Sequence, residues 1–170
     1  MNWINIDPAE HERRLALWFQ REGSWGREDI LTPVWHEFTG FYFTPNITVE
    51  ELVERYAAGE RNFIDIRLPE KSDLSGVDLS GAIFLGANLA YSNFTNANLS
   101  NCDLRYSWMR GNFTRANLEG ANIDRADVGG SKFKNANLLD TVGCFGIDCG
   151  ALFEDTIMSD GRVVSYEGRA

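Results

Sequence analysis

A large apolar residue recurs at every fifth position through the middle of the chain. These residues are Leu74, Leu79, Phe84, Leu89, Phe94, Leu99, Leu104, Met109, Phe113, Leu118, Ile123, Val128, Phe133 and Leu138. A small residue stands two places before each of them, and the position between is mostly Asn or Asp. A five-residue period matches neither an α-helix nor a β-strand. It therefore predicts a superstructure in which each quintet makes one short extended step and one corner.

A second period is superimposed on the first, because every fourth quintet carries the same kind of large residue. One series reads Leu74, Phe94, Phe113, Phe133 and Phe153, and another reads Leu79, Leu99, Leu118 and Leu138. The period predicts that one coil takes about 20 residues, so that like residues stack in successive coils. Only the quintet Ser107-Trp108-Met109-Arg110 has four members, which makes its coil one residue shorter.

The pattern resembles the pentapeptide-repeat family, and the tract Ala116-Asn117-Leu118-Glu119-Gly120 is close to the family consensus. The resemblance implies a mainly β fold, a right-handed quadrilateral β-helix, with the large and small positions inside. It covers residues 72–140 almost without a break and extends the expected coil to 61–160. Residues 141–150 are irregular and residues 161–170 are expected to form a C-terminal tail. The helical start and the closing run Phe153–Met158 look like the cyanobacterial kind of this family.

Residues 1–60 contain no repeat and are expected to form an α-helical N-terminal cap. Asp7-Pro8 and Thr48-Val49-Glu50-Glu51 are typical of helix starts. Four of the five tryptophans lie in this segment, namely Trp3, Trp18, Trp25 and Trp35. So few residues cannot bury that much aromatic area among themselves. We expect them to pack on the first edge of the coil, and an aromatic ligand pocket is the less favoured interpretation.

Charge and composition exclude several classes of protein. The formal net charge is −9, and residues 61–170 hold 14 acidic and 11 basic residues, so direct nucleic-acid binding is not expected. The chain has no long apolar run that predicts a membrane span, and its start lacks the pattern of a secretory signal. The three cysteines are an odd number without zinc-ligand spacing, which favours a reducing, cytoplasmic location.

No catalytic, cofactor-binding or metal-binding residues are predicted, and the chain is not expected to be an enzyme. His36-Glu37 resembles the start of a zinc-protease motif, but the second histidine of that motif is absent. Cys102 occupies an inward small position and is expected in the core. Cys144 and Cys149 are interpreted as core or incidental thiols, and a redox pair is the less favoured alternative.

One predicted surface feature stands out. Trp108 occupies an Asn/Asp position, close in the coil to Tyr106, with Tyr91 about one coil earlier and with Arg105 and Arg110 beside it. Exposed Trp, Tyr and Arg side chains are typical of protein-binding sites. The alternative is that Trp108 only covers the corner shortened by the missing residue.

The favoured function is a non-catalytic protein-binding or scaffold module, because rigid solenoids present extended surfaces. Its partner is expected to be another protein, and the chain itself a monomer or a weak homodimer. The alternative comes from the family resemblance: some members imitate the DNA duplex and bind a type II topoisomerase such as gyrase. The low net charge of the coil and the basic residues Arg115, Lys132 and Lys134 argue against that alternative, since an imitation phosphate array needs dense negative charge.

Overall fold

The computed structural model describes residue 9, residues 46–146 and residues 150–167. The chain separates into two compact units, Met1–Pro45 and Asn46–Ala170. Apart from Ala9, which is helical, the first unit lies outside the described residues. The helix expected to start at Asp7-Pro8, and the four N-terminal tryptophans, therefore lie outside them too.

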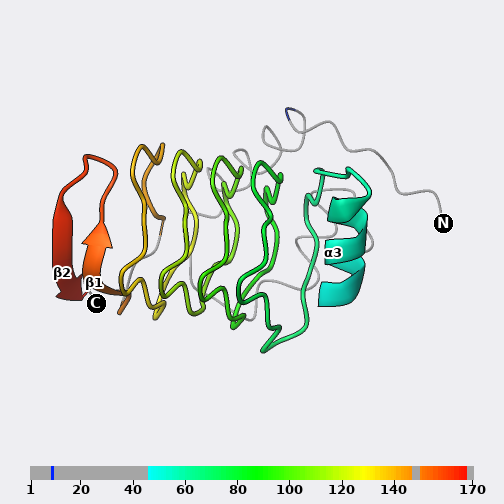
Figure 1. The fold of residues 1–170 in the computed structure, drawn as a ribbon, viewed down its shortest axis with the longest axis horizontal. Coiled ribbons are helices and arrows are strands. Elements are labelled where there is room, and N and C mark those ends of the chain that lie inside the picture. Colours follow the sequence, from blue (N-terminus) through cyan, green and yellow to red (C-terminus); the bar gives the residue numbers. More distant parts are fainter. Residues whose placement is uncertain (1–8, 10–45, 147–149, 168–170) are drawn as a thin grey trace, which may run out of the picture. The chain divides into compact units, whose positions relative to one another are not determined.

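The second unit is a β-solenoid (Figure 1). Parallel bridges join each coil to the next at four positions, which gives the coil four sides. In one coil these bridges are Asp73↔Asn93, Asp78↔Asn98, Ile83↔Asp103 and Asn88↔Trp108. Each bridge is made by backbone hydrogen bonds, such as that from the Leu99 N–H to the Asn117 carbonyl at 2.7 Å. The predicted five-residue step and four-quintet coil are both confirmed.

The large residues of the repeat stack in columns inside the coil. Phe94, Phe113, Phe133 and Phe153 form a continuous stack with ring centroids 5.0–5.1 Å apart and nearly parallel planes. All four are fully buried, as is the leucine column that contains Leu99. Burying each such side chain contributes about 1.5–3 kcal/mol. The core is therefore continuous along the solenoid, although each coil adds only one side chain to each column.

Each corner of the regular five-residue quintets is a turn with one residue in the left-handed region. In the example Phe94–Ala97, the Ala97 N–H donates to the Phe94 carbonyl at 3.0 Å and Asn96 has φ of 59°. Positive φ at the third residue alone defines a type II turn. The preceding Asn93 closes the corner, because its Oδ1 accepts a hydrogen bond from the Thr95 N–H at 3.2 Å. The Asn/Asp position of the repeat therefore stabilises the turn that follows it.

The expected missing residue is confirmed near Trp108. Asn93 and Asn112 are bridged across 19 residues, whereas Asp73 and Asn93 are bridged across 20. The omitted position is the left-handed corner residue, which is Tyr91 in the preceding coil. Gly111 accommodates the shortened corner, since a Cβ there would lie 2.5 Å from the Ser92 carbonyl oxygen.

The coil begins earlier than the sequence predicted. Asn46 bridges to Arg67, and the Ile47 N–H donates to the Arg67 carbonyl at 3.2 Å. The predicted boundary at residue 61 is therefore too late. Asn46 matches the Asn/Asp position of a quintet and Ile47 matches its large apolar position. A helix follows them in place of a corner, so the repeat is not recognisable in the sequence there.

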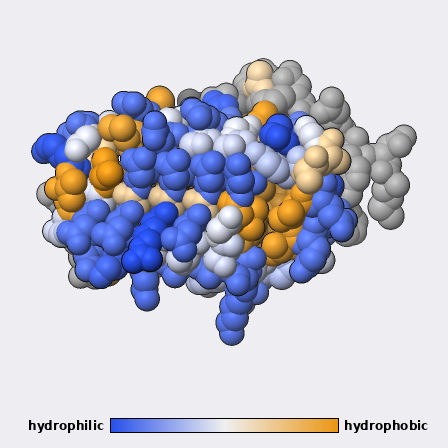
Figure 2. Space-filling model, in the orientation of Figure 1, coloured by the Kyte–Doolittle hydropathy of each residue, from blue (hydrophilic) through white to orange (hydrophobic). Residues whose placement is uncertain are grey.

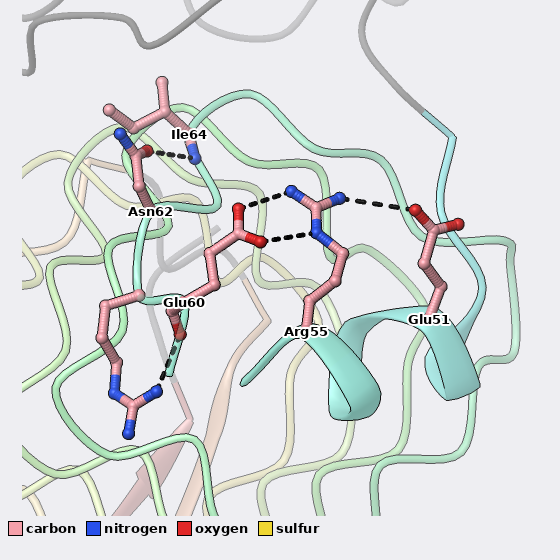
Figure 3. Close-up of polar contacts among 6 residues, drawn as sticks. Glu51, Arg55, Glu60, Asn62 and Ile64 are labelled. Atoms are coloured by element: carbon pink, nitrogen blue, oxygen red, sulfur yellow. Dashed lines mark hydrogen bonds and ion pairs between the residues drawn. The ribbon is translucent and has the colours of Figure 1, made fainter. Parts of the chain in front are cut away.

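That helix, α3 (Val49–Ala57), lies over the first coil. Thr48 is its N-cap and accepts a hydrogen bond from the Glu51 N–H, as the capping pattern predicted. Leu52 is fully buried in the same core as the coil residues. The Arg55 guanidinium binds Glu60 through two hydrogen bonds of 2.6 and 2.8 Å and contacts Glu51 (Figure 3). Glu60 directly follows the helix, so this pair fixes the path of the chain back into the coil.

The last coil ends in two strands, β1 (Leu152–Ile157) and β2 (Val163–Glu167). β1 belongs to the coil, because it bridges in parallel to Lys132 and Asn137. β2 returns antiparallel to β1, and Val164 packs against the core. The predicted resumption of the repeat after residue 150 is confirmed, and part of the expected tail is a strand.

We expect Leu99→Asp to abolish folding, because it places an unpaired charge in a fully buried column. Thermal unfolding followed by circular dichroism should lose its cooperative transition. Asn101→Asp is the matched control, since that residue is exposed and Asp tolerates its left-handed conformation. Cooperative unfolding of Leu99→Asp near the wild-type temperature would contradict the register described here.

We expect Ser131→Ala to lower the free energy of unfolding by about 2 kcal/mol. The buried Ser131 hydroxyl donates to the Met109 carbonyl at 3.0 Å and accepts from the Gly111 N–H at 3.1 Å, so it satisfies both backbone groups of the shortened corner. Ser92→Ala is the control, because the equally buried Ser92 hydroxyl has no hydrogen-bond partner. Urea unfolding measures the free energy of unfolding of both variants. Equal losses of stability in Ser131→Ala and Ser92→Ala would refute the role of Ser131.

Candidate protein-binding surface

Trp108 lies on one side of the coil that we call the tryptophan face. This face consists of the outward bridge residues Asn46, Arg67, Asn88, Trp108 and Asp127. In the coils before and after, the equivalent side chain closes the next corner: Asn88 accepts from the Ala90 N–H at 3.1 Å and Asp127 from the Gly129 N–H at 2.9 Å. An indole cannot accept such a bond. Trp108 therefore stands where other coils carry a residue that closes the next corner. That corner is the shortened one, which lacks the residue with positive φ.

Arg110 links the shortened corner to the next coil. Its guanidinium contacts the Asp127 carboxylate at 2.9 and 3.0 Å, and the Asp127 side chain is only 4% exposed. Hydrogen bonding to Asp127 raises the pKa of Arg110, and a further hydrogen bond to the Tyr91 side chain acts in the same direction. Arg110 therefore holds groups from three successive coils together.

Tyr91 is the most exposed aromatic residue of this region. It occupies the left-handed corner position with φ of 62°, and its side chain is 54% exposed. Its backbone N–H donates to the Arg110 carbonyl, which places the two corners directly one above the other. Of the five residues predicted for the patch, the structure brings Tyr91 and Arg110 into contact, and half-buried Trp108 lies two residues before Arg110 on the tryptophan face.

The other two predicted residues do not share this arrangement. Tyr106 is only 5% exposed, so the expectation that it belongs to an exposed aromatic group is corrected. Arg125 from the next coil lies over its ring at 5.7 Å, which helps to explain the burial. Arg105 forms hydrogen bonds of 2.7 and 2.8 Å with Asp103, on the neighbouring side of the coil. Burial of a corner side chain depends on the side chains above and below it, which the quintet alone does not specify.

Sequence reasoning missed Asp127, the residue that orients Arg110. The signal is present in the sequence, because Asp127 is the Asn/Asp residue one short coil after Trp108. An arginine beside the missing residue, together with an aspartate at the Asn/Asp position of the following coil, predicts an ion pair between the two coils. That inference requires counting the coil as 19 residues instead of 20.

The described residues contain no group of three or more His, Cys, Asp or Glu side chains that could hold a metal ion. His11, His36 and Cys149 lie outside them.

Cys102 is in the core as predicted, and burial raises the pKa of its thiol to about 12. Cys144 is exposed, and its N–H lies 3.5 Å from the Asp124 carboxylate. In the described part of the chain no helix is long and apolar enough to cross a membrane.

The charges on the outer surface of the coil differ from one side to another. Lys132 and Arg115 are exposed on one side, and Lys134 pairs with Glu154 at 2.5 Å beside them. At the other end of that side, hydrogen bonds from Ser75 lower the pKa of Asp73, and on the next side hydrogen bonds from Ser80 lower the pKa of Asp78. Of the four sides of the described coil, the side that bears Asp78, Glu119, Asp140 and Asp160 carries acidic residues alone, whereas the other three carry both signs of charge.

Comparison with known proteins supports this architecture. The family model of pentapeptide repeats matches residues 71–105 and 112–141, in eight copies. The two matched stretches leave out the shortened corner. Among solved structures, alr5209, a pentapeptide repeat protein from Nostoc PCC 7120, is 30% identical, with a TM-score of 0.54 over 57% of this chain and 79% of that one. The chain belongs to the pentapeptide-repeat family.

Two further structures of pentapeptide repeat proteins resemble this pentapeptide-repeat chain less closely. Rfr23 from the cyanobacterium Cyanothece 51142 is 21% identical, with a TM-score of 0.43 over 62% of this chain and 88% of that one. A protein from the Arabidopsis thaliana thylakoid lumen is 31% identical, with a TM-score of 0.27 over 58% of this chain and 59% of that one. A comparison with curated proteins found no match.

We expect a thiol reagent to modify Cys144 and spare Cys102 in the folded protein near pH 8. The thiolate is the reactive form, and a pKa of about 12 leaves Cys102 protonated and buried at that pH. Peptide mapping by mass spectrometry after labelling distinguishes the two sites. Labelling of Cys102 at the rate seen in urea-unfolded protein would contradict its position in the core.

Proposed function

We propose that this protein is a non-catalytic binding module that holds a protein partner on the tryptophan face. The observation that carries the proposal is the cluster of Tyr91, Trp108 and Arg110. Trp, Tyr and Arg are the residues most often found at energetically dominant positions of protein interfaces. Here Trp108 and Arg110 lie at the shortened corner, and Tyr91 lies at the corner of the preceding coil that is stacked on it.

The cluster is also held in place before any partner arrives. Arg110 is fixed by Asp127 and Tyr91, and the backbone beneath it is bonded to the coils on both sides. A side chain that is already ordered loses less conformational entropy on binding. The alternative role, in which Trp108 only covers the corner, accounts for the half-burial of its ring but not for the exposed Tyr91 beside it.

The remaining features of the proposal follow the sequence. Residues 1–60 include the α-helical cap, with α3 as its last helix, and the coil is right-handed. The three cysteines favour a reducing, cytoplasmic compartment.

Imitation of DNA toward a type II topoisomerase such as gyrase is the weaker candidate, because Arg115 and Lys132 interrupt the negative charge that a phosphate array requires. Inhibition of gyrase supercoiling by the purified chain would favour that candidate instead.

We expect Trp108→Asn to weaken partner binding at least about tenfold, which is typical of losing a central aromatic contact. The substitution restores the residue type that the repeat uses, so the free energy of unfolding should not fall. Affinity capture from native lysate identifies the partner by mass spectrometry, and titration calorimetry then measures its affinity for both variants.

Val142→Asn is the matched control, because Val142 is an exposed apolar residue at the equivalent outward position of a different side. It should leave the affinity unchanged. Equal affinities of wild type and Trp108→Asn for the captured protein would refute binding through the tryptophan face. Loss of partner binding in Val142→Asn alone would indicate that the partner binds the side of the coil that carries Val142.

A further inference from the structure

The loop that joins β1 to β2 is a tight hairpin turn (Figure 1). The Gly161 N–H donates to the Met158 carbonyl at 2.9 Å, and the Met158 N–H donates to the Arg162 carbonyl at 2.8 Å. Gly161 has φ of 79°, in the left-handed region that glycine adopts at little cost. A hydrogen-bonded turn followed by a left-handed glycine is a common hairpin loop. The loop therefore fixes where β2 starts relative to β1.

The pair Asp160-Gly161 in this loop is chemically prone to a spontaneous rearrangement. It is the only place in the chain where Asp or Asn is followed directly by glycine. In such a pair the glycine nitrogen can attack the side-chain carboxyl carbon of the preceding residue, because glycine has no Cβ to hinder the approach. Both residues are exposed, so water reaches the carboxyl group. The pair therefore meets the requirements for forming a cyclic imide.

Arg162 restrains the Asp160 carboxylate at both of its oxygens. The Arg162 N–H donates to Oδ1 at 3.1 Å, and the Arg162 Nε donates to Oδ2 at 2.5 Å. These hydrogen bonds, from the backbone and then from the side chain, lower the pKa of Asp160. Imide formation requires the neutral acid, because its hydroxyl can leave as water whereas a carboxylate oxygen cannot. The Gly161 N–H is also held by the Met158 carbonyl, so the folded hairpin opposes the reaction in two ways.

We propose that Asp160-Gly161 is a site of spontaneous isomerisation to isoaspartate, and that the Arg162 side chain delays this reaction in the folded hairpin. In the first step the Gly161 nitrogen bonds to Cγ of Asp160 and loses its proton, while the carboxyl hydroxyl leaves, so that one water is released. Water then adds to one of the two carbonyl carbons of the imide. Opening at the main-chain carbonyl leaves the chain running through Cγ, which is isoaspartate, whereas opening at Cγ restores aspartate. The reaction needs no oxidant and no reactant other than water.

Isomerisation in this loop loosens β2. It adds one carbon to the main chain, so the two hydrogen bonds that close the loop no longer fit. β2 covers the last coil, because Val164 packs against the core and the Tyr166 ring stacks on Phe153 with centroids 4.8 Å apart. Apolar side chains already lie at the surface of this end among hydrophilic ones (Figure 2), and Val163 is 63% exposed. The modification therefore uncovers further apolar surface, and it goes beyond the proposed function because it does not involve the tryptophan face.

Peptide mapping of the aged full chain by mass spectrometry tests this proposal. The chain is incubated for weeks at neutral pH and physiological temperature, and chromatography separates the isoaspartyl from the aspartyl form of the peptide that spans Asp160-Gly161. Arg162→Gln should accumulate isoaspartate at this pair at least about threefold faster than the wild type, because a higher pKa of Asp160 leaves more of the neutral acid. The wild type unfolded in urea should also react faster than the folded wild type.

Arg125→Gln is the matched control, because Arg125 also lies beside an aspartate, Asp124, but away from this loop. It should leave the rate at Asp160 unchanged. Asp160→Asn is the positive control and should react faster than the wild type, since a neutral amide needs no protonation of a carboxylate before it cyclises. Equal rates in Arg162→Gln and the wild type, equal rates in folded and unfolded wild type, or isoaspartate confined to other positions would each overturn the proposal.

Hydrogen exchange of the purified isoaspartyl form tests the consequence for the fold. The amides of Val163–Glu167 should exchange at least about tenfold faster in this form than in the unmodified chain, because the antiparallel pairing with β1 is weakened. The Leu99 amide, which donates to the Asn117 carbonyl inside the coil, is the internal control and should be unchanged. Unchanged exchange throughout β2 would show that the loop tolerates the additional carbon and would overturn the loosening of the strand.

Discussion

The left-handed corner residue is the constraint on which the rest of the solenoid depends. Each quintet can turn through a type II corner only if its third turn residue takes positive φ. Glycine does so at little cost, yet eleven described residues other than glycine adopt it, including Asn96 and Tyr91. The cost of those conformations is offset by hydrogen bonds between coils and by the Asn or Asp side chain that closes the corner. Removing that residue at one corner explains both the requirement for Gly111 and the altered chemistry around Trp108.

This arrangement separates the residues that determine the fold from those that can carry function. Inward positions are restricted to small residues and to Leu, Phe or similar side chains, because every coil must fit the one below it. Outward corner positions tolerate tyrosine, arginine and asparagine in the same backbone conformation. The outer surface can therefore change its recognition properties without disturbing the core. The proposed binding residues Tyr91, Trp108 and Arg110 would be such a change, located at and beside the shortened corner.

The period predicted most of the coil because buried, stacked positions impose the same choice of residue in every layer. It predicted the shortened coil at Trp108 for the same reason. It did not predict that the coil begins at Asn46, since α3 interrupts the repeat after a single step. Nor did it predict the burial of Tyr106 or the pairing of Arg110 with Asp127, which depend on side chains in neighbouring coils. Those side chains face outward, so nothing in the repeat itself fixes their contacts.

The shortened corner also indicates how such a chain can change length. The single-residue gap is absorbed by Gly111 and the Ser131 hydroxyl, and the phenylalanine column continues through it with unchanged ring spacing. A gap of one residue thus requires local repair, whereas duplication or loss of a whole coil would leave every layer matched to its neighbours. Gene rearrangements in multiples of one coil are the changes in length that this architecture accepts most readily.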